Sequence, residues 1–540
     1  MLDKYAALEL ELRMQPFPLA LEEIHYDAED PSVQKLLREA TSISYDALYL
    51  YKISKGIPFV ALEAWLEENS KRQLIFLEED LYEVHQAMNA PWGEKLFSHP
   101  RVHVYRLSQE DDDLLEYLAE KFPCENIGVF TLEKRSAKMR RLEVALLRKT
   151  VLFHSVVSEI LSGPVLHQNM ISNLKKLPQS FYVNQTAGAF KDLPAIICGA
   201  GPSLETVAKE LKELQDKVLI IGCGSALSAL SHLGIRPHLG IALDPNPRER
   251  ECLQGCQERD IPLIYGTRLY PTVFELFDGP YGYLRSPSVS SLERLIEEEL
   301  GFTEEGIGED LGREALSVTT LALSLASFWG CSSVALAGVD LSFREGKHYS
   351  KGVHLKASFT PPCVGEKRLR RQSVYGKTVM TQLKWIMEQE TIDAYTKNYP
   401  HITFTHAAQE GLGFSQIPYQ SLSLIKQVPT HLISNSIEAM IKNHPLSIDE
   451  EKIHQTLNQI GNSFMRCLEL LSLLKEEKEG SGKAILYEED LLEEKVYIRV
   501  LNPALEAIEK VHALQQEAPL GRRKWTLLHE MVLEYKKLFL

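Results

Sequence analysis

The sequence feature that most constrains this fold is a short apolar run that leads through a glycine turn into a helical pattern. In LPAIICGAGPSLETVAKEL, residues 193–211, four apolar residues precede the turn, and apolar residues then recur at helical spacing. Such a run is typical of a strand buried on both faces. Gly199 and Gly201 permit positive φ and close approach of another group to the backbone. We expect Pro202 to take the φ of a first helical residue and Ser203 to be the N-cap.

The same order repeats downstream in KVLIIGCGSALSALSHLGIRPHLGIALDPNP. The pattern predicts a strand at 218–221, a helix at 225–233 that ends at Gly234, and a strand at 239–243. Strands that alternate with helices indicate a parallel arrangement. The predicted fold class is therefore α/β, with a central doubly wound, mostly parallel, Rossmann-like sheet.

One uncharged run, residues 315–339, is long enough to span a bilayer. It contains several Ser and Thr residues, and Gly330 divides it. We therefore expect a helix capped near Ser317 and a strand at 334–337, which is another helix–strand pair of the sheet.

The chain of 540 residues is too long for one hydrophobic core and suggests about three domains. Strand-like segments near residues 46–53, 73–77 and 101–107 predict an N-terminal α/β domain over residues 1–165. The glycine turns belong to a central domain over residues 166–430. Apolar stripes at helical spacing predict a C-terminal helical domain over residues 431–540.

Composition excludes several classes of function. With 74 acidic and 59 basic residues, the formal charge is −15, which disfavours sequence-independent binding to nucleic acid. The eight cysteines are scattered, and Cys252 and Cys256 lack the second pair that a zinc site needs, so no metal site is predicted. The N-terminus has no signal-peptide pattern. We expect a cytoplasmic protein without an integral membrane segment.

The predicted strands end in residues suited to ligand binding. In doubly wound sheets the ligand crevice lies outside the carboxyl ends of the strands. Glycine turns and acidic residues stand at these ends, so we expect them to converge on one site. These residues are Gly199, Ala200, Gly201, Pro202, Ser203, Gly222, Gly224, Ser225, Asp244 and Asp340. The first turn, at 199–203, would form a nest for a phosphate group, and the alternative is a tight turn without a ligand.

Four blocks in order resemble a known family. They are NMISNLKKLPQSFYVNQTAGAFKDLPAIICGAGPSL, ALSALSHLGIRPHLGIALDP, LSVTTLALSLASFWGCSSVALAGVDLSFREGKHYSKG and HAAQEGLGFSQIP. Over residues 169–418 the chain resembles the bacterial Maf (motility-associated factor) flagellin glycosyltransferases, whose central domain is similar to that of sialyltransferases. The resemblance implies transfer of a nonulosonic sugar from a CMP-activated donor to a Ser or Thr hydroxyl of a flagellin-like protein. The sequence carries no signal for oligomeric state.

The same superfamily includes archaeal hydroxymethylpterin diphosphokinases, which transfer diphosphate from ATP. Their Asp-x-Asp-Gly element stands where this chain reads IALDPNP, with Ala242 and Pro245 beside the single acid Asp244. Mg²⁺ would be required only in that reaction. A CMP leaving group can be stabilised by hydroxyls and backbone N–H groups, so no cofactor is expected for the glycosyltransferase.

The resemblance assigns roles to several residues. The first turn would bind the donor phosphate, and the cytidine would lie near Gly222, Gly224 and Ser225. His348 would be the general base, with Tyr349 and Lys347 as donors to the leaving phosphate. Asp340 would either orient the sugar or base, or cap the segment that follows it.

Departures from the family pattern keep a third possibility open. Ala242, Leu412 and the spacing around His348 differ from the usual motifs, as in a non-catalytic scaffold that has kept a nucleotide-binding sheet. His354 and His406 are alternative bases or loop residues, and His238 is expected at the surface. We expect the basic run at 366–373 to be a solvated loop, with a lid over the donor as the alternative.

Overall fold

The structure is a computed structural model of the chain. It describes residues 26–41, 45–108, 112–122, 124, 126–134, 136–161, 163–287, 290–311, 317–354, 368–514 and 520–539. Most of the N-terminal segment that lacks a signal pattern lies outside these residues, as do residues 366 and 367 of the basic run.

The chain divides into two compact units, Met1–Val157 with Pro361–Lys367, and Ser158–Thr360 with Arg368–Leu540. The first unit contains a four-stranded parallel sheet in the order β3-β2-β1-β4. Its strands are β1 (Ala47–Tyr51), β2 (Gln73–Glu78), β3 (Val102–Arg106) and β4 (Ile127–Phe130). Its helices are α2 (Pro31–Thr41), α3 (Ile57–Glu67), α4 (Leu81–Asn89), α5 (Pro91–Ser98) and α6 (Asp112–Lys121), and α7 (Ala137–Leu161) leads into the second unit. The strand-like segments of the N-terminal region are thus real strands.

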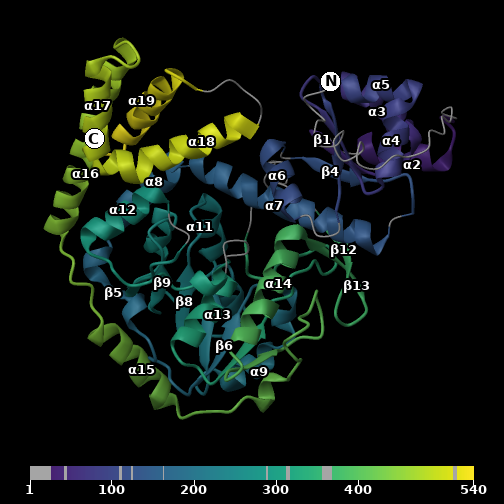
Figure 1. The fold of residues 1–540 in the computed structure, drawn as a ribbon. Helices are drawn as coiled ribbons and strands as arrows, with labels where there is room; N and C mark the ends of the chain where they lie inside the picture. Colours follow the sequence, from purple (N-terminus) through teal and green to yellow (C-terminus); the bar gives the residue numbers. More distant parts are fainter. Residues whose placement is uncertain are drawn as a thin grey trace. The chain divides into compact units, whose positions relative to one another are not determined.

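The second unit is built on an eight-stranded sheet in the order β14-β11-β6-β7-β8-β9-β10-β5, in which all neighbouring strands are parallel (Figure 1). The strands are β5 (Ser180–Tyr182), β6 (Pro194–Cys198), β7 (Leu219–Cys223), β8 (Leu239–Ala242), β9 (Leu263–Tyr265), β10 (Tyr281–Tyr283), β11 (Ser333–Ala337) and β14 (Thr403–His406). A separate antiparallel hairpin consists of β12 (Arg368–Gln372) and β13 (Thr378–Gln382). The predicted mostly parallel α/β fold is confirmed.

Helices connect these strands and continue beyond them. The helix α8 (Gly163–Leu174) precedes β5. Between the strands lie α9 (Ala208–Leu214), α10 (Ala226–His232), α11 (Pro247–Leu253), α12 (Ser291–Leu300), α13 (Val318–Phe328) and α14 (Leu383–Asn398). The C-terminal part contains α15 (Thr430–Asn443), α16 (Glu450–Glu476), α17 (Gly482–Glu493), a π-helical turn (Tyr497–Leu501), α18 (Asn502–Leu514) and α19 (Arg523–Lys536). The apolar stripes predicted in this region therefore lie on helices.

The C-terminal helices share a hydrophobic core with one half of the large sheet. Tyr265 and Tyr283 of β9 and β10 belong to the same buried cluster as Phe464 of α16 and Trp525 of α19. All four side chains are buried. Because burial of large aromatic side chains contributes strongly to stability, these helices and the sheet stabilise one another.

Short segments pair with both outer strands of this sheet. At one edge the Tyr182 N–H donates to the His444 carbonyl at 2.7 Å, and the Leu446 N–H donates to the Ser180 carbonyl at 2.9 Å. At the other edge the His406 N–H donates to the Pro418 carbonyl at 3.1 Å. Backbone groups of β5 and β14 are therefore paired on their outer sides as well.

The run at 315–339 forms a helix and a strand, as predicted. Ser317 caps α13 through a capping box with Thr320, and Gly330 has φ +76° just after the helix. Within the described residues, none of the helices is long and apolar enough to cross a membrane.

Two local predictions are wrong. Residues 202–205 form a 3₁₀ turn with Gly201 as its N-cap at φ −65°, so Ser203 is not the cap and Gly201 does not need positive φ. Residues 368–372 form strand β12 instead of a loop, because each pairs with a residue of β13.

Candidate functional site

The large sheet has its topological switch point between β6 and β11. From β6 the chain builds outward through β7 to β10 on one side, and then continues with β11 and β14 on the other. Ligands of doubly wound sheets bind at such a point. The first glycine turn follows β6, and Asp340 lies in the loop after β11.

At the switch point the two loops touch through their backbones. The Gly199 N–H donates to the Ala337 carbonyl at 2.8 Å, and the Gly201 N–H donates to the Gly338 carbonyl at 2.7 Å. A Cβ on Gly199 or Gly201 would lie 2.7 or 2.6 Å from the Gly338 oxygen. The glycines are therefore required for close approach of the two loops.

Asp340 holds the first turn from the opposite loop. Its carboxylate accepts a hydrogen bond from the Ser203 N–H at 2.8 Å and another from the Ser203 hydroxyl. Burial raises the pKa of Asp340, and the hydrogen bonds from Ser203 act in the opposite direction. The N–H groups of Gly199, Gly201 and Ser203 all have partners within the protein. The predicted nest is thus occupied by the protein itself at these three groups.

One loop joins the first turn to the second. The Ser350 N–H donates to the Ala200 carbonyl at 2.8 Å, and the Ser350 hydroxyl donates to the Gly201 carbonyl at 2.7 Å. The side chain of the preceding residue, Tyr349, lies near that of Ser225 in the second turn. The segment 348–350 therefore contacts both glycine turns.

His348 stands at the start of this segment within a group of aromatic side chains. Its ring centroid lies 4.0 Å from that of Tyr349, 5.7 Å from that of Phe343 and 6.0 Å from that of Trp385. Burial raises the pKa of Tyr349 to about 12, with further contributions from nearby acidic groups, so its phenol keeps its proton at neutral pH. Lys347 is exposed. The structure therefore brings His348 and Tyr349 together beside the second turn.

The second turn follows β7. Gly222 has no space for a Cβ because Leu227 packs against it, and Gly224 has φ +49°, where glycine is favoured. Ser225 immediately precedes α10 and is its N-cap residue. The predicted helix at this place is present, and its N-terminus faces the turn.

Asp244 lies just after β8 and is exposed. Its Oδ1 accepts hydrogen bonds from the Asn246 N–H at 2.8 Å and from the Asn246 side-chain amide at 2.6 Å. Its charge also raises the pKa values of Tyr349 and Glu249, which places it at the same site. Within the described part of the chain, no three His, Cys, Asp or Glu side chains are grouped so that they could hold a metal ion.

Glu249 of α11 is a site residue that the sequence did not reveal. Its side chain is only 7% exposed, and its Oε1 has no hydrogen-bond partner among the described residues. Burial, with a contribution from Asp244, raises its pKa to about 8. In the sequence Glu249 stands in the charged run RERE, which is typical of a solvated helix face, and no motif marks it.

The other histidines occupy different environments. His238 is half-buried, accepts a hydrogen bond from the Ile220 N–H at 3.0 Å, and has its pKa lowered to about 4 mainly by burial. The surface position expected for His238 is therefore wrong. His354 is exposed. His406 is buried and pairs with the Tyr375 hydroxyl through Nε2 at 2.7 Å, and burial lowers its pKa.

The loop with the sequence EGLGF packs on the backbone of Asp340. The Leu412 N–H donates to the Asp340 carbonyl at 2.9 Å, and Gly411 has φ +79° where it passes that carbonyl. Arg344 forms an ion pair with Glu410 at 2.7 Å. This loop therefore supports Asp340 from the side opposite the first turn.

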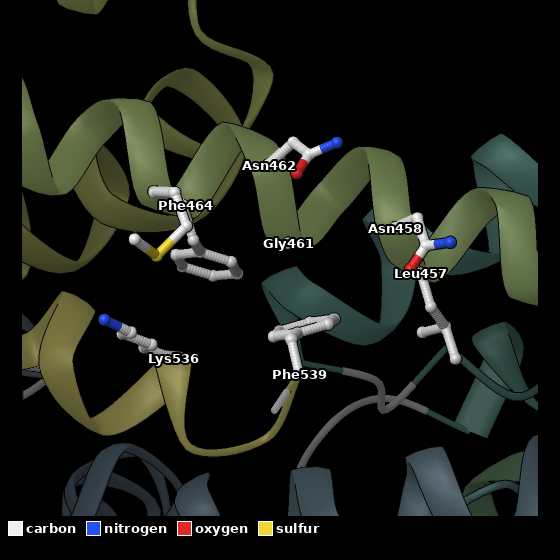
Figure 2. Close-up of a pocket in the computed structure, with 8 residues that line it drawn as sticks. Leu457, Asn458, Gly461, Asn462, Phe464, Lys536 and Phe539 are labelled. Carbon is white, nitrogen blue, oxygen red and sulfur yellow. The ribbon is translucent and has the colours of Figure 1, made fainter.

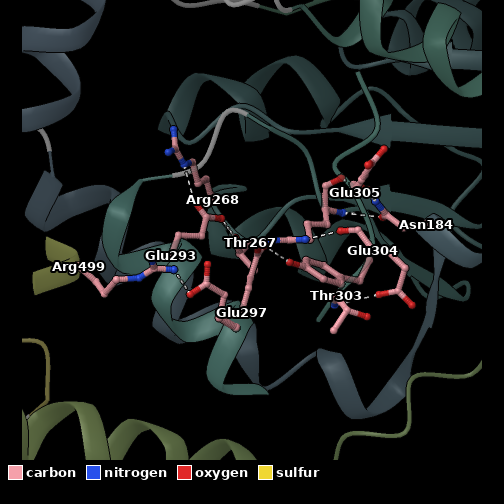
Figure 3. Close-up of polar contacts among 12 residues, drawn as sticks. Asn184, Thr267, Arg268, Glu293, Glu297, Thr303, Glu304, Glu305 and Arg499 are labelled. Atoms are coloured by element: carbon pink, nitrogen blue, oxygen red, sulfur yellow. Dashed lines mark hydrogen bonds and ion pairs between the residues drawn. The ribbon is translucent and has the colours of Figure 1, made fainter. Parts of the chain in front are cut away.

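A second polar cluster lies at the carboxyl ends of β9 and β10 (Figure 3). Glu293 and Glu297 of α12 are both buried, and each pairs with an arginine: Glu293 with Arg268 at 2.8 Å and Glu297 with Arg285 at 2.7 Å. Since these charges are paired and hydrogen-bonded within the protein, the cluster needs no ligand.

A small cavity of about 170 Å³ lies between α16 and the end of α19 (Figure 2). It is lined by Leu457, Asn458, Gly461, Asn462, Phe464, Met465, Lys536 and Phe539. Phe539 fits against Gly461, where a Cβ would lie 3.3 Å from it. None of the residues predicted for the site lines this cavity.

Comparison with known proteins agrees with the fold. Residues 168–346 match the family described as 6-hydroxymethylpterin diphosphokinase MptE-like. The solved structure of the MAf glycosyltransferase from Magnetospirillum magneticum AMB-1 aligns with a TM-score of 0.50 and 16% identity, over 99% of this chain and 86% of that chain. The Purine catabolism regulatory protein of Bacillus subtilis (strain 168) is 26% identical over 97 residues, and the match covers 18% of each chain.

The site and sheet define a doubly wound α/β protein with glycine turns and acidic residues at the carboxyl ends of its central strands. The chain resembles the superfamily that contains the Maf glycosyltransferases and the MptE-like diphosphokinases, as its sequence motifs predict. At 16% identity the structural likeness shows the fold alone.

Proposed function

We propose that this protein is a glycosyltransferase that moves a nonulosonic sugar from a CMP-activated donor to a Ser or Thr hydroxyl of a flagellin-like protein. The observation that carries the proposal is the segment 348–350, which contacts both glycine turns and sets His348 beside Tyr349. A base and a protonated phenol next to one another are what transfer from a phosphate leaving group to a hydroxyl acceptor requires.

In the proposed reaction His348 takes the proton of the acceptor hydroxyl. The hydroxyl oxygen then forms a bond to the anomeric carbon of the sugar, and the bond between that carbon and the donor phosphate oxygen breaks. CMP leaves with the electron pair of that bond. Tyr349 and Ser225 donate hydrogen bonds to the leaving phosphate, because their hydroxyls lie at the second turn.

The phosphate therefore belongs at the second turn in this proposal, instead of the first. The Ser203 N–H and hydroxyl already bind the Asp340 carboxylate, whose charge would repel a phosphate. At the second turn the phenol of Tyr349 remains protonated. Asp340 acts in this proposal as a positioning residue that fixes the first turn. No metal is needed for this leaving group.

Calorimetric titration tests the proposal with three ligands: CMP, a CMP-nonulosonate, and ATP with Mg²⁺. We expect binding of CMP and of the CMP-sugar, followed by transfer of the sugar to flagellin as a mass increase in an intact-protein spectrum. Binding of neither nucleotide would leave a non-catalytic scaffold as the better description.

A second candidate is transfer of diphosphate from ATP to a hydroxymethylpterin-like substrate. It is favoured by the description of the family that matches residues 168–346. Binding of ATP with Mg²⁺ in the same titration, without binding of CMP, would support this candidate.

A further inference from the structure

Oε1 of the buried Glu249 carboxyl has no hydrogen-bond partner in the part of the chain that the structure describes. The side chain comes from α11 and lies against the second turn, where its Oε1 is 3.5 Å and its Oε2 4.0 Å from the position of a Cβ on Gly224. Apart from Gly224 and its two chain neighbours, no other described residue lies within 4 Å of that position. A buried polar atom without a partner is costly, so the unpaired Oε1 beside the second turn is a candidate contact for a ligand.

The chemistry of this carboxyl is that of a neutral acid. Its pKa of about 8 leaves most of it protonated at neutral pH. A protonated carboxyl offers one O–H donor and one carbonyl acceptor side by side. A matching ligand must present an acceptor next to a donor at the same spacing. Ring nitrogens with a neighbouring amino group have this pattern, as in cytosine and adenine.

We propose that Glu249 binds the amino-bearing edge of the nucleobase at this site, and that the base is the cytosine of the CMP donor. The carboxyl O–H would donate to N3, and the carbonyl oxygen would accept from the N4 amino group. This assignment rests on the proposed function. Adenine presents the same edge through N1 and N6, so an adenine nucleotide is the other source of this chemistry.

The groups that face Glu249 come from three elements. Asp244, in the loop after β8, contributes negative charge. Tyr349, in the loop after β11, and Cys252, on α11 itself, have pKa values of about 12 because of burial. Tyr349 and Cys252 both keep their protons up to well above pH 9. Of these groups, Glu249 is therefore the one that loses its proton between pH 7 and pH 9.

The test measures CMP binding by calorimetry in the full chain at pH 7 and pH 9. For the parent we expect about tenfold weaker binding at pH 9, because ionisation removes the donor and sets a carboxylate against N3. Glu249→Gln keeps one donor and one acceptor, so it should bind within about threefold of the parent at pH 7 and lose the pH dependence. Glu249→Ala should bind roughly ten- to a hundredfold more weakly.

Two comparisons distinguish hydrogen bonding of Glu249 to the nucleobase from a general effect of charge or of folding on CMP binding. Glu213→Gln removes an exposed carboxylate on α9 and should bind like the parent at both pH values. N4,N4-dimethyl-CMP lacks the amino hydrogens, so the parent should bind it more weakly than CMP, while Glu249→Ala should bind both alike. This comparison within one variant does not depend on how stable that variant is.

The outcomes distinguish this inference from the proposed function. If CMP binds and neither the Glu249 variants nor the methylated ligand changes its affinity, the inference is wrong and the proposed function stands. If ATP binds and CMP does not, the glycosyltransferase proposal fails, and the same variants with N6,N6-dimethyl-ATP decide whether Glu249 pairs with the base. Binding of neither nucleotide overturns both.

Discussion

The carboxylate of Asp340 accepts two hydrogen bonds from Ser203, one from its backbone N–H and one from its hydroxyl. The two residues stand on either side of the switch point of the sheet, so this pair fixes the separation of the β6 and β11 loops. The first turn, residues 199–203, which suggests a phosphate nest in the sequence, therefore has a structural role. It supports a proposed site that is centred on the second turn.

Ser203→Ala should destabilise the protein by about 1–3 kcal/mol, because it leaves a buried carboxylate oxygen of Asp340 without its donor. The measurement is urea-induced unfolding followed by circular dichroism. Ser434→Ala, which changes an exposed serine of α15, is the control and should alter the free energy of unfolding by less than about 0.5 kcal/mol. Equal effects of the two substitutions would show that the pair contributes little.

Gly201→Ala should impair folding rather than ligand binding alone. A Cβ there would lie 2.6 Å from the Gly338 oxygen and 2.8 Å from Oδ2 of Asp340, so the loops would have to separate. Gly482→Ala, at the start of α17 with open space around it, is the matched control. Thermal unfolding measures both, and a melting temperature of Gly201→Ala equal to that of the control would contradict the steric argument.

His348→Ala should lower the rate of sugar transfer by roughly 10²- to 10⁴-fold if the imidazole is the general base, with donor affinity almost unchanged. An imidazole must be neutral to take a proton, so the parent should lose activity at acid pH and the variant should lose that dependence. His354→Ala, at an exposed position on the same loop, is the control. If His348→Ala keeps a turnover near that of the parent and still loses activity at acid pH, His348 is not the general base. His406 would then be tested.

Glu249→Gln should be more stable than the parent at pH 8, and the difference should shrink as the pH falls toward 4.5. The pKa of Glu249 is raised in the folded state from 4.5 to about 8, so folding binds a proton between these values. The parent therefore loses stability as pH rises through that window, by at most about 1.4 kcal/mol per pH unit, and no further above it. Chemical unfolding of both proteins at several pH values measures the difference between their free energies of unfolding. The other buried acids are present in both proteins, so their contributions to this difference cancel. A difference that does not vary with pH would contradict the assigned protonation state.

Chelation of divalent metal should leave most of the transferase activity intact, because the departing CMP is stabilised by hydroxyls in the proposed reaction. The assay is sugar transfer with and without EDTA. Complete loss in chelator, with recovery on addition of Mg²⁺, would favour the diphosphokinase.

The large-scale fold could be predicted because its signals are local. The runs that became β6 to β8 and β11 are continuous and apolar, and glycine turns end most of them. Ser317 and Gly330 mark the ends of α13 by their capping chemistry. These features depend on a few neighbouring residues, and a single sequence contains all of them.

The candidate site could be predicted only in part, because its contacts are far apart in the sequence. Nothing local shows that Asp340 binds Ser203, which it approaches across 137 positions of the chain. A glycine that permits close packing looks the same in sequence as one that permits positive φ, so the sequence alone does not decide between these two roles for Gly201. The burial of Glu249 cannot be predicted from the sequence for the same reason. Its neighbours, the turn at Gly224 and Tyr349, lie on other elements.

The pairing of residues 418 and 444–446 with the outer strands has a consequence for self-association. Open edges of a sheet are templates on which further chains can add strands. Here the segment that leaves β14 pairs along its outer side, and the chain then passes through α15 to pair with β5 at the opposite edge. A single stretch of some thirty residues, 418–446, thus closes both sides of the sheet. A chain cut within it would retain the residues of both glycine turns but offer a free β5 to other copies, and aggregation would remove it from solution before activity could be measured.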